Sequence, residues 1–261
     1  MVSGAIDYQL HRDIIEVLVA DFENDTSPPI SLPGISRDAL ACTWGFYAQV
    51  HRLGRSLLLL IDNDMEHETH IIARVALEYT IMLHWIVERK EAAVKAILAS
   101  QSNNIKRHVK LAQEAEMFLP PEVEREMRKA EIKPIDDAKA VGTFKTVCKE
   151  LGALELYFVY GVESGFVHPS LVGINSYIDS RGNPANEPQR VMHRSNISLL
   201  AYCLIWANRD LDSLTPGRPR ADGLERLANT VEAIPALPVY RELSKTAQKN
   251  RQHSNEGRRK K

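Results

Sequence analysis

The sequence predicts an all-α protein built as a multi-helix bundle, and three observations lead to this prediction. Apolar residues recur at helical spacing through most of the 261 residues. Alternating strand patterns and internal repeats are absent from the sequence, and stretches rich in proline and glycine separate the apolar segments. Hydrophobic residues make up 44% and charged residues 26% of the chain, which is ordinary for a globular protein with a large core.

The expected helix boundaries follow from capping residues and prolines. A first amphipathic helix covers about residues 5–22, and the stretch NDTSPPISLPG then forms a loop. Ser36 is a suitable N-cap for a long helix that ends near residue 62. Further helices are expected at about 65–89, 90–118, 121–131, 136–151, 153–168 and 189–213, with one short helix after them. Pro169 ends the 153–168 helix, and residues 170–188 form a long loop that has room for a β-hairpin.

These elements divide the chain into three expected parts. Residues 1–35 hold the first helix and its proline-rich loop, and residues 36–215 form the core of the bundle. Residues 216–261 hold the short helix and a basic tail that we expect to be disordered, with eight Lys and Arg against two Glu from residue 241 onward.

Charge and cysteine content exclude several classes of protein. The chain has 33 Lys and Arg against 34 Asp and Glu, so no overall field attracts it to nucleic acid or to an anionic membrane. Its three cysteines are far apart and form no CxxC pair, which favours reduced thiols. The N-terminus lacks a signal peptide, and the apolar runs are too short to span a bilayer. We therefore expect a cytoplasmic protein without a membrane partner.

Two polar stripes lie inside helices that are otherwise apolar nearly all round. Arg74 and Glu78 are set in the run IIARVALEYTIMLHWIV, where they share a helical face with His67. A helix of this kind is typical of a buried position, so its charged groups must find partners in the interior. The second stripe follows the spacing i, i+3, i+7 and i+11 in LELYFVYGVESGFVHPS and comprises Tyr157, Tyr160, Ser164 and His168.

The residue types in the two stripes suggest acid–base chemistry on an anion. His168 is the candidate general acid or base, oriented by Ser164 or Glu78, and Arg74 is the candidate that stabilises an anion. The candidates for binding or orienting are Tyr160, Ser164, Tyr157 and His67.

We expect no metal and no cofactor. His67 and His70 lie three residues apart in the sequence, whereas the helical zinc motif of metalloproteases needs its histidines four apart, and no third ligand is evident. The glycine-rich signatures of nucleotide-binding loops are absent from the sequence.

The pattern Arg-x-x-x-Glu followed by Tyr-x-x-x-Ser-x-x-x-His-Pro resembles a bacterial and phage family of helical proteins known only as a domain of unknown function. The matching residues lie in RVALE and in YGVESGFVHP, and the resemblance covers about residues 36–213. More distantly, the pattern is similar to the HEPN superfamily of helical toxins, antiphage effectors and RNA-processing nucleases. That resemblance implies metal-independent cleavage of RNA by an Arg-x-x-x-x-His motif, usually paired across a dimer. This chain has Glu163 five residues before His168, so Arg74 would have to supply the cation.

Three interpretations of the function stay open at this point. The first is an RNA-directed, HEPN-like defence or stress protein, either a ribonuclease or an inactive relative, and a homodimer is part of that expectation. The second is a regulatory module in which the polar cluster recognises a small ligand or a partner. The third is a purely structural cluster that fixes how the helices pack.

Overall fold

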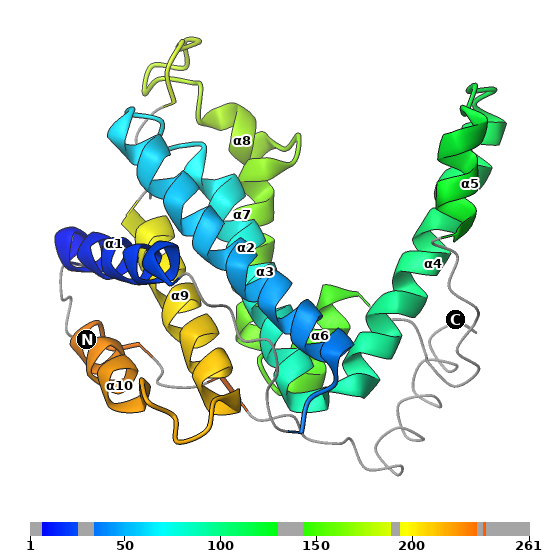
Figure 1. The fold of residues 1–261 in the computed structure, drawn as a ribbon. Coiled ribbons are helices and arrows are strands. Elements are labelled where there is room, and N and C mark those ends of the chain that lie inside the picture. The colour runs from blue at the N-terminus through cyan, green and yellow to red at the C-terminus, as the bar shows by residue number, and fades with distance from the viewer. Residues whose placement is uncertain (1–6, 26–33, 130–142, 189–193, 234–236, 239–261) are drawn as a thin grey trace, which may run out of the picture.

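The computed structural model describes residues 7–25, 34–129, 143–188, 194–233 and 237–238, and this part of the chain confirms an all-α, multi-helix architecture (Figure 1). The described helices are α1 (Tyr8–Asn24), α2 (Arg37–Asp62), α3 (Thr69–Arg89), α4 (Glu91–Glu114), α5 (Pro121–Lys129), α6 (Phe144–Leu151), α7 (Leu154–Val167), α8 (Leu171–Asn175), α9 (Arg194–Leu214) and α10 (Ala221–Thr230).

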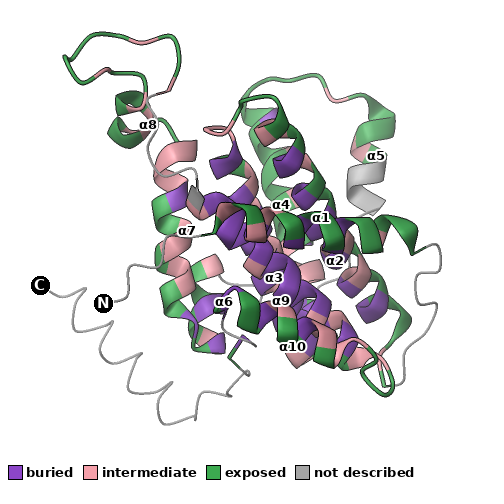
Figure 2. Ribbon diagram, turned by 90° about the vertical axis from the view of Figure 1, so that its left-hand side faces the viewer, coloured by how far each residue is buried: buried purple, intermediate pink, exposed green. Residues whose placement is uncertain are grey.

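Helix α3 forms the centre of the bundle. It packs against α2, α9 and α7, and its later turns also contact α4 and α6. Leu77 and Ile81 of α3 are fully buried, as are Leu200 and Leu204 of the facing helix α9. Figure 2 shows buried residues concentrated along α3 and α9. The near-uniform apolar character of the α3 sequence therefore has its expected cause, since neighbours cover most of its surface.

Helix α1 packs across α2 and α9, and a glycine sets how close the three helices come. A Cβ atom built on Gly54 would lie 2.9 Å from Val19 Cγ2 and 3.2 Å from Leu204 Cδ1. Ile15 and Leu18 of α1 are also buried in this region. The first helix is thus part of the same hydrophobic core as α2, α3 and α9.

A buried polar network joins α2 to α9. The His51 ring is 1% exposed; its Nδ1 lies 2.9 Å from the Tyr47 carbonyl, and its Nε2 accepts from the Asn208 amide at 3.0 Å. Asn208 Oδ1 accepts from the Tyr47 hydroxyl at 2.9 Å and from Arg220 at 2.7 Å. Burial lowers the pKa of His51 to about 4, the Tyr47 carbonyl opposes this shift, and the Arg220 charge adds to it. The ring is therefore neutral, with its proton on Nδ1.

The remaining helices lie around this centre. Gly152, whose φ is +74°, forms the left-handed cap after the last residue of helix α6, and α7 then runs along α3 and α6. Helix α4 diverges from the bundle and leads into α5, so the two form an arm in Figure 1. Helix α10 packs against α9.

Several predicted boundaries need correction. The loop expected at 170–188 contains the short helix α8, for which Ser170 is the N-cap, and the expected hairpin is reduced to a single bridge between Ile178 and Pro184. Helix α3 begins at Thr69 instead of about 65, because residues 66–68 form a turn, and α4 ends at Glu114 instead of 118. Parts of the expected helices at 136–151 and 189–213, and the basic tail, lie outside the described residues.

Helix α3 also bears on the prediction that no segment spans a membrane. It is long and apolar enough to cross a bilayer by length and composition alone, and it is the one such helix among the described residues. More than half of it is buried inside the bundle, and the core helix of a soluble protein passes the same test.

Candidate functional site

The two polar stripes meet where α3 packs against α7. Arg74 Nε of α3 donates to Ser164 Oγ of α7 at 2.9 Å, and Arg74 Nη2 donates to the Tyr160 hydroxyl. The guanidinium carbon also lies 4.4 Å from the centre of the Tyr160 ring. Ser164 Oγ in turn donates to the Tyr160 carbonyl at 2.7 Å. Contacts with α7 therefore fix the direction of the Arg74 side chain.

The expectation that Arg74 and Glu78 belong to a buried cluster is wrong for Glu78. Glu78 Oε2 lies 3.7 Å from Arg74 Nη2, and the side chains are 16% exposed for Arg74 and 39% exposed for Glu78. The pair lies one turn apart at the edge of the α3–α7 contact, where solvent reaches it. Exposed pairs of this kind contribute about 0.3–0.5 kcal/mol. The main partners that hold Arg74 are therefore the α7 side chains, and Glu78 supplies a nearby negative charge.

A buried polar contact of this region joins His70, one turn before Arg74, to Glu163. His70 Nδ1 lies 2.6 Å from Glu163 Oε2, and the side chains are 2% and 7% exposed. The Phe166 ring stacks on His70 with centroids 4.0 Å apart. Asn196 of α9 lies beside this contact. When its side-chain nitrogen donates to Glu163 Oε2 at 3.2 Å, its side-chain oxygen accepts from Thr69 Oγ1. This network ties α3, α7 and α9 together.

Sequence reasoning missed the role of Glu163, which it noted only as a departure from the HEPN pattern. The signal was present, because Glu163 is a charged residue in an apolar helix and lies on the same stripe as Phe166 and Val159. An unpaired carboxylate is not tolerated in such a position, so the residue required a partner. His70, at the edge of the polar face of α3, is that partner.

His168 lies at the end of α7, one turn beyond Ser164, and its side chain is exposed. Its backbone N–H donates to the Ser164 carbonyl at 3.0 Å. Within the described residues, the His168 ring has no hydrogen-bond partner, so neither Ser164 nor Glu78 orients it as we expected. The arrangement leaves the imidazole accessible to a bound molecule.

An open cleft lies beside His168, between the start of α3, the end of α7 and α8. Its volume is about 420 Å³. His67 lies in its wall, with its ring centroid 5.7 Å from Tyr177 and 6.3 Å from Phe166. The cleft is lined by three histidines, His67, His70 and His168, next to aromatic rings on which a planar group could stack.

Tyr157 lies away from Arg74, on the side of α7 that faces α6. Its ring stacks on Tyr160 with centroids 6.0 Å apart, and Phe144 lies 4.5 Å from Tyr160. Lys145 Nζ is 5.5 Å from the centre of the Tyr157 ring. Tyr157 thus supports the position of Tyr160, and no contact in the described structure joins it to the cleft.

The described part of the chain brings together no group of three His, Cys, Asp or Glu side chains that could hold a metal ion. The chemistry that the described side chains can offer is acid–base catalysis by an imidazole, anion binding by a guanidinium and stacking on aromatic rings.

Comparison with known families identifies the chain at this point. A model of a family of unknown function, DUF5677, matches residues 41–186, which is more than half of the sequence. The chain belongs to the DUF5677 family. The matched range contains most of α2 and all of α3 to α8, and it therefore includes the site residues from His67 to His168. Searches of curated proteins and of solved structures gave no match to this DUF5677 protein.

Proposed function

We propose that the protein binds single-stranded RNA at the α3–α7 site and cleaves it without a metal ion. The observation that carries the proposal is the contact of Arg74 with Ser164 of α7, because Ser164 lies one turn before the exposed His168. Arg74 Nη1 makes no hydrogen bond within the described residues, so it is available to a phosphate oxygen. The resemblance to HEPN nucleases stated above supports the same reaction class.

The cleft supports RNA as the substrate class. Sequence-tolerant recognition of single-stranded nucleic acid depends on stacking of bases against aromatic rings, together with a cation for the backbone. Tyr177 and Phe166 supply the rings in the cleft wall, and Arg74, which bonds to Ser164 of the same helix that carries Phe166 and His168, supplies the cation. The net charge of −1 gives no general attraction to nucleic acid, so binding would depend on this local arrangement.

The reaction uses groups of the substrate and one imidazole. Neutral His168 accepts the proton of a ribose 2′-hydroxyl as that oxygen attacks the adjacent phosphorus, and the bond from phosphorus to the 5′ oxygen breaks. The leaving oxygen takes a proton from water, which yields a 2′,3′-cyclic phosphate and a free 5′-hydroxyl. Arg74 binds a non-bridging phosphate oxygen and stabilises the negative charge that develops there.

One observation favours a second candidate, a binding module without catalysis. The His168 ring has no orienting partner among the described residues, whereas efficient general bases are normally held by a neighbouring group. Glu78 also lies 3.7 Å from Arg74 and reduces its positive field. In this alternative the same cleft recognises a small ligand or a segment of a partner, and binding to Arg74 is retained without cleavage.

The test is cleavage of a mixed single-stranded RNA pool in EDTA by wild type, His168→Ala and Arg74→Gln. His108→Ala is the matched control, because His108 is another exposed histidine and lies on α4, far along the chain from the site. We expect His168→Ala to lower the rate at least 100-fold and the control to leave it unchanged. Absence of cleavage by wild type would reject the nuclease, and RNA binding that is lost in Arg74→Gln would then support the binding module.

A further inference from the structure

An open groove lies along the first half of α4, where the arm formed by α4 and α5 leaves the bundle (Figure 1). Its volume is about 470 Å³, and Met82 of α3 lines it on the side of the bundle. The α4 residues that line it follow the spacing i, i+3, i+4, i+7, i+8 and i+11 of one helical face. They are Ile97, Ser100, Gln101, Asn104, Ile105 and His108. Leu111, which is 50% exposed, continues the same face at i+14.

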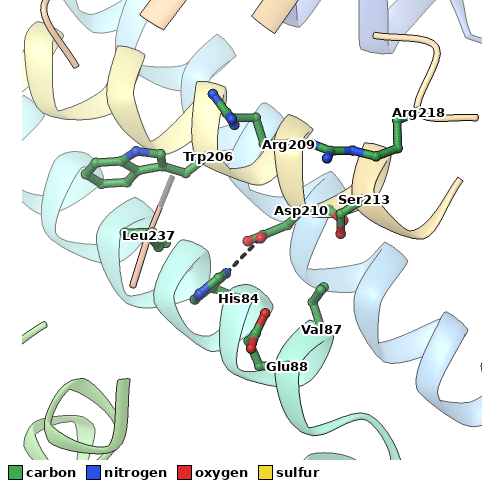
Figure 3. Close-up of a pocket in the computed structure, with 9 residues that line it drawn as sticks. All are labelled: His84, Val87, Glu88, Trp206, Arg209, Asp210, Ser213, Arg218 and Leu237. Carbon is green, nitrogen blue, oxygen red and sulfur yellow. Dashed lines mark hydrogen bonds and ion pairs between the residues drawn. The ribbon is translucent and has the colours of Figure 1, made fainter. Parts of the chain in front are cut away.

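The base of the arm is fixed to the rest of the bundle. Figure 3 shows His84 of α3 paired with Asp210 of α9, and His84 Nδ1 lies 2.8 Å from Asp210 Oδ1. Burial acts to lower the pKa of His84, but the hydrogen bond and charge of Asp210 outweigh it and raise the pKa. At the start of α4, Glu91 Oε1 accepts from the Ser36 backbone N–H at 3.0 Å. The groove is therefore preformed, so binding there does not have to order it.

The tip of the arm carries the most exposed large apolar side chain of the described residues. Phe118 is 84% exposed, and its neighbour Met117 is 63% exposed. The Met117 N–H donates to the Ala112 carbonyl of α4 at 2.9 Å, which holds the turn after the helix. Aromatic and methionine side chains are enriched at the centres of protein interfaces. The arm thus has an apolar tip and an apolar groove, one on each side of Leu111 along the chain.

The charges of the arm are segregated about Leu111. The basic residues before it and the acidic residues after it are all exposed, and they are Lys106, Arg107, Lys110, Glu114 and Glu116. Glu114 lies 3.6 Å from Lys110 of its own helix, but an exposed pair of this kind contributes little. A second arm in parallel orientation would bring like charges together. An antiparallel arm instead brings its acidic end beside the basic part of the first.

We propose that two copies of this chain dimerise through their arms, which pair antiparallel about Leu111. Asn104 of the groove lies seven residues before Leu111, and Phe118 lies seven residues after it. A two-fold axis at Leu111 therefore seats Phe118 of each copy in the groove of the other. The same axis brings Arg107 of one copy beside Glu114 of the other, because they lie four residues before and three after the centre. One register satisfies the apolar tip, the groove and the charges.

Charge also argues against the C-terminal tail of the same chain as the occupant of the groove. Residues 241–261 carry eight Lys and Arg against two Glu, so the basic part of α4 repels them. The interface uses no residue of the α3–α7 site and does not rest on the proposed cleavage of RNA. Two slender arms belong to the low end of interface sizes, so we expect a dimer that forms at about 100 μM and dissociates at about 1 μM.

The test is sedimentation equilibrium of the purified full-length chain between about 1 and 100 μM. Wild type should approach twice the chain mass at the upper concentration, and Phe118→Ser should raise the dissociation constant at least tenfold. Phe158→Ser is the matched control, because Phe158 is 71% exposed and lies on α7, outside the arm. It should dimerise as wild type does. A wild type that stays monomeric at about 100 μM would overturn the proposal, and so would a dimer that is lost in Phe158→Ser but kept in Phe118→Ser.

Charge reversal tests the antiparallel register. Arg107→Glu should weaken the dimer at least tenfold, because it sets two carboxylates against each other across the interface, and addition of Glu114→Arg should restore the affinity. Arg226→Glu, on the exposed face of α10, is the control and should dimerise as wild type does. Both arm positions are exposed, so these variants should keep the fold, which circular dichroism verifies. A double variant that stays as weak as Arg107→Glu would overturn the register about Leu111.

Discussion

Lowering the pH should destabilise the protein through His51, and the structure gives the size of the effect. The folded state holds this ring neutral, with a pKa of about 4, whereas the unfolded chain has a histidine pKa of about 6.5. The depressed pKa means that the unfolded state binds a proton first as the pH falls. The stability due to neutral His51 is therefore complete above about pH 6.5 and is lost progressively between about pH 6.5 and pH 4.

The expected loss follows from the difference of about 2.5 units between the two pKa values. At about 1.4 kcal/mol for each unit, the whole window corresponds to about 3.5 kcal/mol, and about 2 kcal/mol of this is lost between pH 7.5 and pH 5. The physical cause is specific, because a proton on Nε2 would face the N–H of Asn208. Asn208 cannot reverse its amide without loss of the hydrogen bonds that its oxygen accepts from Tyr47 and Arg220.

Urea unfolding at pH 7.5, 6.5, 5.5 and 5 measures this effect in wild type, His51→Gln and the exposed control His108→Gln. Wild type and the control should lose about 2 kcal/mol more than His51→Gln between pH 7.5 and pH 5. The comparison uses the slope with pH, so a lower overall stability of His51→Gln does not affect it. Parallel pH profiles for wild type and His51→Gln would refute the reasoning, because they would show that His51 gains no proton on unfolding.

Three further predictions concern packing and the other buried histidines. Gly54→Ala should lower the free energy of unfolding by about 1–3 kcal/mol, because its Cβ would lie 2.9 Å from a neighbouring side-chain carbon. Gly45→Ala is the control and should raise the free energy of unfolding by about 0.5–1 kcal/mol, because a Cβ there would have nothing within 4 Å. Similar free energies for both variants in urea unfolding would contradict this prediction. Glu163→Ala should cost about 3–5 kcal/mol, since it removes the buried contact with His70 Nδ1, and the exposed Glu155→Ala should cost under about 0.5 kcal/mol. A small effect of the first variant would show that the contact is dispensable. The folded protein raises the pKa of His84, so the contribution of this residue to the free energy of unfolding is complete below about pH 6.5 and declines as the pH rises through the raised value. The difference in free energy of unfolding between wild type and His84→Gln should therefore shrink from pH 6 to pH 9. A constant difference over this range would exclude the effect.

The sequence predicted the fold class because the signal is local. The helical period of apolar residues and the positions of Ser36 and Pro169 depend on neighbours within a few residues, and these fixed most helix boundaries to within a few residues. Helix α8 escaped prediction because it is a single turn, too short to show a period, in a stretch rich in glycine and asparagine. Local patterns of this kind are silent about which face of one helix meets another.

The candidate site was predictable in part for the same reason. The polar stripe of α7 identified Tyr160 and Ser164, and both contact Arg74 in the structure. The degree of burial was not predictable from one helix, because it depends on how far neighbouring elements extend, and Glu78 proved to be half-exposed. The pairing of His84 with Asp210 joins residues 126 positions apart, and no pattern in either helix alone indicates it.

The position of α9 has a consequence for the limits of the recognised family region. The DUF5677 match ends at residue 186, before α9 begins at Arg194, yet α9 supplies a large part of the surface that covers α3. A fragment cut to residues 41–186 would expose the face of α3 that α9 now covers and would leave Glu163 without Asn196. The segment that sequence comparison delimits is thus smaller than the unit that folds. Expression of the matched region alone should give an aggregating protein, and homologues are better compared over a range that extends through α9.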